Sequence, residues 1–185
     1  CQTTTAGDII HVTAGTYTET AVASLKAGVS LEGEGAATTV IKSSIAGDWS
    51  VLLVLESPAN TNGNQSISGI TFDGQYVSET SYKTWWGIHV SGRSNVTIRD
   101  CIVKNFYDRG VNFDGNTVWN PLVDPGNYAT GNKFYNNSLL NTARCTNNYG
   151  AVQLNIVGQN GMAIYGNTMR QDQRPTFKTG WPIKY

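Results

Sequence analysis

The side chains that could carry acid–base chemistry are concentrated in short segments of alternating polar and apolar residues. Gly87–Gly92 and Gly110–Gly115 share one such pattern, and Ala151–Asn155 follows it. Alternate residues of a strand point to opposite sides, so the polar residues should share one outward side. We call this outward set the polar strip and expect each of its columns to receive one residue per coil. It comprises His89, Ser91, Asn112, Asp114, Gln153 and Asn155, and Lys184 continues it.

These residue types suit the cleavage of an acidic glycan by elimination. That reaction needs a cation beside the uronate carboxylate, a base for the C5 proton and a proton for the leaving oxygen. Asp114 suits either a Ca²⁺ ligand or an acid/base role, so Ca²⁺ is a possible cofactor. A solvated sheet face with Asn and Ser ladders is the alternative interpretation. The candidate catalytic residues are His89, Arg93, Arg109, Asp114 and Lys184.

Aromatic and amide side chains beside the strip predict saccharide binding. Sugars offer C–H patches to aromatic faces and hydroxyls to polar groups. An inserted loop around residues 116–130 adds two aromatic residues, in a composition typical of an ordered surface loop. The alternative is that these rings pack beneath the loop. The candidate substrate-binding residues are Asn112, Gln153, Asn155, Trp86, Trp119 and Tyr128.

The elements that must position these groups are repeated short strands. Four segments beginning at Ser66, Thr97, Lys133 and Ala163 share apolar positions on either side of a Gly, Asp or Asn. Such residues tolerate the left-handed backbone that a corner needs. Two apolar columns result, one of Ile67, Ile98, Phe134 and Ile164, the other of Phe72, Val103, Leu139 and Met169.

An antiparallel sandwich and a solenoid both contain short recurring strands. Asp73-Gly74 and Asp114-Gly115 could mark hairpins, but the residues after each pair do not mirror those before it. The column alignment favours a solenoid, an all-β chain that forms one domain over residues 1–185. In it Asn137 and Asn167 should share a corner column, where their amides can bond from coil to coil.

The segment Gly7–Glu19 resembles the first coil of pectate-lyase-like right-handed parallel β-helix proteins of the pectin-lyase superfamily. Gly28–Gly35 with Thr39–Ile41 is similar to the second coil, and Ser94–Cys101 resembles the inner coils. The resemblance implies a right-handed parallel β-helix, a single-stranded β-solenoid. It is weak for function, because the fold serves several enzyme classes, adhesins and tailspikes. The chain lacks the three clustered acidic residues that usually bind calcium in pectate lyases, and the paired Asp residues of polygalacturonase-like hydrolases.

Composition limits the partners and the compartment. Charged residues are 14% of the chain, against roughly 25% in typical globular domains, and the formal net charge is zero. We therefore expect no nucleic-acid partner, while the polar strip and its aromatic residues predict a polysaccharide partner. No apolar run reaches membrane-spanning length. The three cysteines leave open a Cys1–Cys145 bridge, and Cys101 should be buried.

Both ends read as uncapped strands, which predicts a segment of a longer solenoid or ends covered by another chain. The favoured function is a secreted or cell-surface, polysaccharide lyase-like protein. The alternative is a non-catalytic extracellular β-helix module, such as an adhesin, surface or filament subunit.

Overall fold

A computed structural model describes residues 3–78, 84–115, 125–145, 151–172 and 181–184. These ranges consist mainly of β-strands and contain one short 3-10 helix, at Pro125–Asn127. The strands of the first half are β1 (Ile9–Val12), β2 (Gly15–Glu19), β3 (Ala23–Ser24), β4 (Ser30–Gly33), β5 (Thr39–Ser43), β6 (Val51–Ser68), β7 (Thr71–Asp73), β8 (Trp86–Arg99) and β9 (Ile102–Lys104). Those of the second half are β10 (Arg109–Asp114), β11 (Ala129–Thr130), β12 (Lys133–Tyr135), β13 (Ser138–Leu140), β14 (Val152–Val157), β15 (Gln159–Asn160), β16 (Ala163–Tyr165), β17 (Thr168–Arg170) and β18 (Trp181–Lys184).

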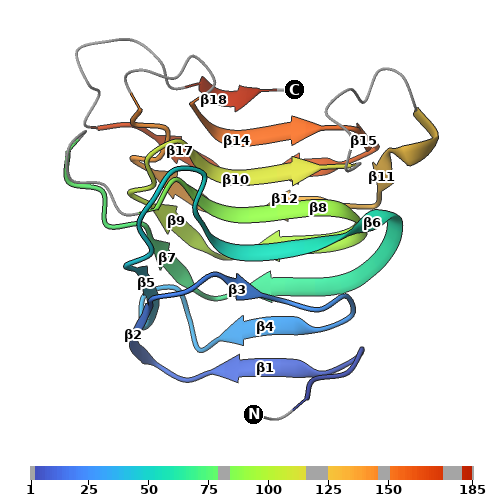
Figure 1. Cartoon of the computed structure of the whole chain (residues 1–185), viewed down its shortest axis with the longest axis horizontal. Helices are drawn as coiled ribbons and strands as arrows, with labels where there is room; N and C mark the ends of the chain where they lie inside the picture. The colour runs from blue at the N-terminus through green and yellow to red at the C-terminus, as the bar shows by residue number, and fades with distance from the viewer. Residues whose placement is uncertain (1–2, 79–83, 116–124, 146–150, 173–180, 185) are drawn as a thin grey trace.

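The strands stack as successive coils along one axis, from β1 near the N-terminus to β18 near the C-terminus (Figure 1). Strand pairs within the described residues are all parallel. The predicted all-β parallel β-helix is therefore confirmed. Each coil presents three faces. Face 1 carries β3, the first parts of β6 and β8, β10, β14 and β18; face 2 carries β1, β4, the second parts of β6 and β8, β12 and β16; face 3 carries β2, β5, β7, β9, β13 and β17.

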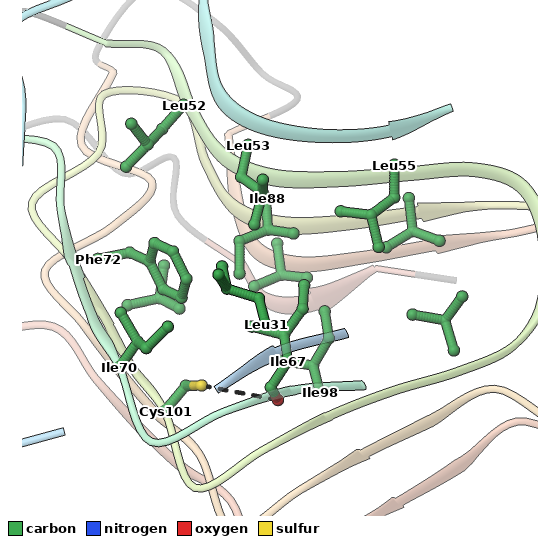
Figure 2. Close-up of a cluster of buried hydrophobic side chains, with 14 of the residues drawn as sticks. Leu31, Leu52, Leu53, Leu55, Ile67, Ile70, Phe72, Ile88, Ile98 and Cys101 are labelled. Carbon is green, nitrogen blue, oxygen red and sulfur yellow. Dashed lines mark hydrogen bonds between the residues drawn. The ribbon is translucent and has the colours of Figure 1, made fainter. Parts of the chain in front are cut away.

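The register confirms both predicted apolar columns. Ile98 pairs with Ile67 on one side and with Phe134 on the other, and Phe134 pairs with Ile164. The second column follows the same order, from Phe72 through Val103 and Leu139 to Met169. Their side chains fill the interior between the three faces, where Leu53, Ile67, Ile88 and Ile98 lie together (Figure 2). Cys101 is buried in this core as expected, and burial raises the pKa of its thiol to about 12.

The corner between faces 2 and 3 uses the predicted left-handed residues. Gly69, Asp100, Asn136 and Gly166 occupy equivalent positions with φ of 68°, 54°, 55° and 65°. At the position after each of the bends at Asp100 and Asn136, a side-chain amide of the next coil bonds the backbone N–H. Asn137 Oδ1 accepts a bond from Cys101 N at 3.0 Å, and Asn137 Nδ2 donates to Ile98 O at 3.0 Å. Asn167 Oδ1 accepts from Asn137 N at 2.9 Å, so the predicted coil-to-coil asparagine column is confirmed.

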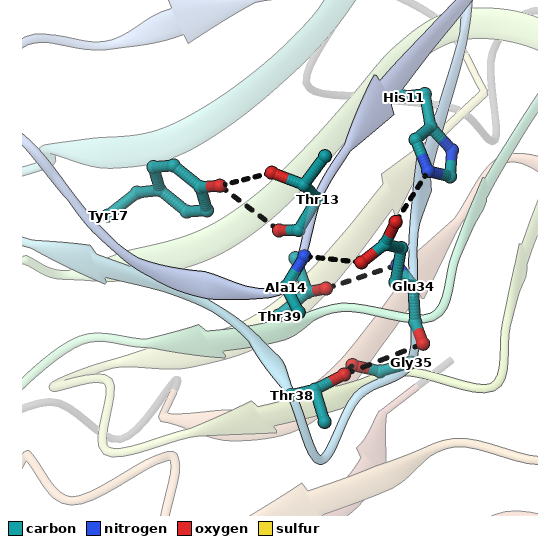
Figure 3. Close-up of polar contacts among 8 residues, drawn as sticks. All are labelled: His11, Thr13, Ala14, Tyr17, Glu34, Gly35, Thr38 and Thr39. Atoms are coloured by element: carbon teal, nitrogen blue, oxygen red, sulfur yellow. Dashed lines mark hydrogen bonds and ion pairs between the residues drawn. The ribbon is translucent and has the colours of Figure 1, made fainter.

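A carboxylate secures the corner that joins the first two coils. Glu34 accepts a bond from the backbone N–H of Ala14 at 2.7 Å and contacts His11 Nε2 at 3.4 Å (Figure 3). The N–H of Ala14 first, and then His11, lower the pKa of Glu34. His11 and Glu34 are open to solvent, with side-chain exposures of 52% and 44%. The pair therefore orders a surface corner.

Two expectations lie partly outside the described ranges. Cys145 is buried against Tyr107, but Cys1 is not described, so a Cys1–Cys145 bridge stays an open alternative. The predicted loop around 116–130 is described only from Pro125, where the 3-10 helix leads into β11. Within the described ranges, no helix is long and apolar enough to cross a membrane.

Replacing Asn137 with Leu should strongly destabilise the fold. The substitution leaves the buried Cys101 N–H and Ile98 carbonyl without partners, and each such group costs about 1–3 kcal/mol. We expect the free energy of unfolding to fall by about 2–5 kcal/mol in urea denaturation. The control Asn160→Leu changes an exposed amide on β15 and should shift it by no more than about 0.5 kcal/mol. Equal losses of unfolding free energy in the two variants would contradict the stabilising role of the asparagine column.

Glu34 should give the fold a pH-dependent increment of stability. Its pKa is lowered in the folded state, so the increment is present above the ordinary pKa of 4.5 and is lost as the pH falls below it. We expect Glu34→Gln to have a lower Tm than the wild type at pH 6, with a difference that shrinks as the pH falls through the lowered pKa of Glu34. Glu32→Gln alters the net charge equally and serves as the control. A Tm difference that is constant with pH would contradict this account.

Candidate functional site

The polar strip forms on the outer side of face 1. Asn112 pairs with His89 in the preceding coil and with Asn155 in the following coil, and Asn155 pairs with Lys184. Asp114 pairs with Ser91. The inward residues between them, such as Val111 and Phe113, are fully buried. The strip therefore exists because the apolar side of each strand is held in the core, which directs the polar side outward.

His89 and Asp114 lie on the same outward side in adjacent coils, as predicted. His89 Nε2 is 2.9 Å from Asp114 Oδ2, and the side chains are 18% and 27% exposed. An ionised carboxylate only accepts hydrogen bonds, so Nε2 must carry the hydrogen and donate it. The other ring nitrogen, Nδ1, is then the proton acceptor. Hydrogen bonding to a carboxylate is the arrangement that fixes a histidine as a base.

Two asparagines hold Asp114 in place. Asn112 Nδ2 donates to Asp114 Oδ2 at 2.7 Å, and Asn155 Nδ2 donates to Asn112 Oδ1. Both amides are buried, with residue exposures of 0% and 4%. They therefore act mainly by positioning the carboxylate, and a sugar hydroxyl has little access to them. The structure thus favours a supporting role for these two predicted substrate-binding residues.

Trp86 joins Arg109 to His89. The Arg109 guanidinium lies 4.5 Å from the centre of the Trp86 ring, and the His89 ring meets the same indole edge-on at 5.3 Å. Arg109 Nη1 also donates to Asn112 Oδ1 at 3.3 Å. A base and a permanent cation therefore flank one aromatic side chain. These are the two kinds of group that cleavage of a substrate with an acidic proton beside a carboxylate requires.

Asp108 supports this arrangement from inside, a role that the sequence did not indicate. Its carboxylate is fully buried, accepts a bond from Trp86 Nε1 at 2.8 Å and lies 3.4 Å from Arg109 Nε. Only the register, which places Arg109 opposite Trp86, reveals that one carboxylate reaches both.

Gln153 does not belong to the outward side of the strip, contrary to our prediction. Asn155, not Gln153, pairs with Asn112, so Gln153 aligns with Gly110. A Cβ at Gly110 would meet buried Leu139, which shows that this position faces the interior. Gln153 is 3% exposed and donates to Arg170 O at 3.2 Å. The strict alternation assumed from the sequence breaks at the start of the strand, where two successive residues point inward.

Arg93 is likewise a structural residue, and its assignment to catalysis is corrected. The residue is 3% exposed. Its guanidinium donates to Leu25 O, Gln65 Oε1 and Glu56 O at 2.8 Å and to Ser57 Oγ at 2.9 Å. Burial lowers its pKa, an effect that Glu56 partly offsets. Arg93 thus ties the bulged middle of β6 to β8 and β3 instead of facing substrate.

Lys184 and Tyr128 lie at the margins of the polar strip. Lys184 is three strands from His89 in its column, roughly 14 Å at about 4.8 Å per strand, and its ammonium lies near Trp181. Tyr128 precedes Ala129, whose backbone N lies beside Gly115 at the Asp114 end of the strip. Trp119 lies outside the described residues.

One further carboxylate on face 1, that of Glu56, was not among the predicted site residues. Glu56 pairs with Ser91, which pairs with Asp114, so the three residues form one outward column on face 1. Across the residues that the structure describes, no group of three or more His, Cys, Asp and Glu side chains could hold a metal ion. Arg109 is the cation that contacts the same indole as His89.

No family model matches the sequence, and no curated protein matches it. Two solved structures are similar in fold. A tailspike protein of the Acinetobacter baumannii bacteriophage Fri1, described as a capsular polysaccharide depolymerase, is 14% identical with a TM-score of 0.60. The match covers 92% of this chain and 32% of the tailspike, so the chain spans about a third of its length. The catalytic unit of an α-1,3-glucanase from Streptomyces thermodiastaticus is 13% identical with a TM-score of 0.46, over 96% of this chain and 36% of that chain.

The contrast between the two arginines yields a paired test. Arg93→Lys loses a planar fork that holds four acceptors, so we expect the free energy of unfolding to fall by about 2–4 kcal/mol. Arg109→Lys loses one hydrogen bond and an indole contact, and the fall should be about 1 kcal/mol or less. Denaturant unfolding measures both values. A larger loss for Arg109→Lys would contradict the structural role of Arg93.

Proposed function

We propose that face 1 carries the glycan-cleaving site of a polysaccharide-degrading β-helix protein with lyase-like chemistry. The observation that carries the proposal is the His89–Asp114 pair, hydrogen-bonded on the outward side of the sheet with Arg109 against the same indole as His89. The fold adds support, because a capsular polysaccharide depolymerase shares it. The substrate class that suits this charge arrangement is an uronic-acid-containing polysaccharide, met outside the cell or at its surface.

His89 is the base in this scheme. Nδ1 takes the C5 proton of the uronate while Nε2–H remains bonded to Asp114, whose negative charge stabilises the imidazolium that forms. The electron pair of the broken C–H bond becomes the C4–C5 double bond as the C4–O bond breaks. The imidazolium then returns its proton to the leaving oxygen. The products are an unsaturated uronate and a new free hydroxyl.

Arg109 supplies the charge that makes the C5 proton removable. Proton loss next to a carboxylate places a second negative charge on that group, and a fixed cation stabilises it. Arg109 is held by Asp108, Asn112 and the Trp86 face, so its orientation is set before substrate binds. A preorganised cation of this kind costs little reorganisation during the reaction.

A second candidate function is a non-catalytic binding module. The burial and mutual hydrogen bonding of Asn112 and Asn155 favour it, because such an amide ladder also forms on sheet faces that carry no chemistry. The two functions differ in one respect: a binding module retains polysaccharide without producing unsaturated ends.

The chemistry can be tested with the chain and a panel of polygalacturonate, alginate and hyaluronan, with and without Ca²⁺. We expect absorbance near 235 nm to rise with one member of the panel. His89→Ala should lower kcat by about 10²–10⁴-fold, the usual contribution of a general base. Asp114→Asn should also lower kcat, because it leaves the histidine without its fixed tautomer.

The matched control is His11→Ala, which removes the imidazole of the chain's other histidine–carboxylate pair. His11 lies on face 2 and is half exposed, so its loss should leave kcat unchanged. New reducing ends without absorbance at 235 nm would replace the lyase mechanism with hydrolysis. Binding without any cleavage would favour the non-catalytic module.

A further inference from the structure

Trp49 is an exposed aromatic residue next to the strip that the proposed mechanism does not use. It lies two residues before β6 and is 57% exposed. Ser50 beside it accepts a bond from Trp86 N at 2.9 Å through its carbonyl, which places Trp49 at the strand-start end of face 1. Because more than half of this residue is exposed to water, burial of its ring contributes little to the stability of the fold.

The backbone at Trp49 is also held in an unfavourable conformation. Its φ is 61°, in the left-handed region, within a turn that Ser50 N closes on Gly47 O at 3.3 Å. Gly or Asn is the usual residue at such a turn position, and a bulky side chain there is an outlier. Strained residues of this kind persist where the surrounding structure over-determines them, and they cluster at ligand sites.

The Trp49 ring is held in place by two other indoles. Its centre is 4.8 Å from that of Trp85, at 43°, and 5.9 Å from that of Trp86, which it meets edge-on. Trp86 in turn contacts His89 and Arg109. The exposed ring is therefore continuous with the strip through one shared side chain.

We propose that Trp49 is a stacking platform for a pyranose ring of the glycan whose neighbouring uronate lies at His89 and Arg109. The assignment rests on the proposed function for its substrate class. An exposed indole that contacts two neighbouring indoles fits the C–H patch of a sugar ring, and these contacts limit the entropy lost on binding. The role is to bind and orient the chain, so loss of the ring affects affinity rather than the chemical step.

Binding is measured in a His89→Ala background, so that no cleavage occurs, with polygalacturonate, alginate and hyaluronan as probes in affinity electrophoresis. Adding Trp49→Ala should weaken binding to the recognised polysaccharide on the order of 10-fold. Trp49→Phe should retain most of the affinity, since a phenyl ring still stacks. The matched control Tyr165→Ala removes a ring of similar exposure, 54%, from face 2 and should change nothing.

In the active protein, Trp49→Ala should raise KM by a similar factor and leave kcat nearly unchanged. Unchanged affinity in Trp49→Ala, or an equal loss in Tyr165→Ala, overturns the platform. Cleavage without dependence on Trp49 sinks the platform and keeps the proposed function. Binding that depends on Trp49 but is not followed by cleavage keeps the platform and overturns the proposed function. If none of the three polysaccharides binds, the platform is overturned.

Thermal unfolding shows whether the Trp49 variants are folded and tests the strain in the left-handed backbone at this position. Trp49→Gly should have a higher Tm than Trp49→Ala, because only glycine adopts this backbone without penalty. Both should show the same loss of affinity, since both lack the ring. The opposite order of Tm values would overturn the left-handed conformation on which the platform argument draws.

Discussion

In-register stacking of parallel strands is the constraint on which the rest of this structure depends. It sets each residue about 4.8 Å from its counterpart in the next coil, whatever the length of chain between them. His89 and Asp114 are 25 residues apart in sequence and yet meet at 2.9 Å. The same stacking forces inward positions to be apolar in every coil. The core thus determines which side chains of each strand point outward, and the candidate site consists of those side chains.

The fold could be predicted from the sequence because each coil repeats the same pattern of apolar positions and corner residues. The columns through Ile98 and Val103, with their left-handed corner residues, gave the correct register for face 2 and face 3. On face 1 the prediction succeeded for His89, Asn112 and Asp114. It failed for Gln153, because the apolar series Val152, Leu154 and Ile156 also fits a register shifted by two residues. The actual register aligns Gln153 with Gly110, where the alternation breaks and the position faces the interior.

The remaining errors concern polar groups in the interior. Arg93 looked chemical because it follows the strip directly. At the bulged part of β6 its guanidinium donates to Glu56 O and Gln65 Oε1, and it also donates to Leu25 O. Asp108 was not among the candidate residues, yet its buried carboxylate contacts both Trp86 and Arg109. No local sequence pattern reports a bulge of this kind or the partner of a buried carboxylate, since both depend on the neighbouring coil.

Enclosure distinguishes the two histidine–carboxylate pairs of the chain. His11–Glu34 has the same chemical groups as His89–Asp114, but at 3.4 Å and about half exposed. Water screens such a pair, so it can order a corner and do little else. His89–Asp114 is closer and less exposed, and buried amides, an indole and a guanidinium surround it. Its charges act in a less screened setting. The break in alternation at the strand start makes this possible, because it turns Gly110 and Gln153 inward and leaves the outer side there to Trp86 and Arg109.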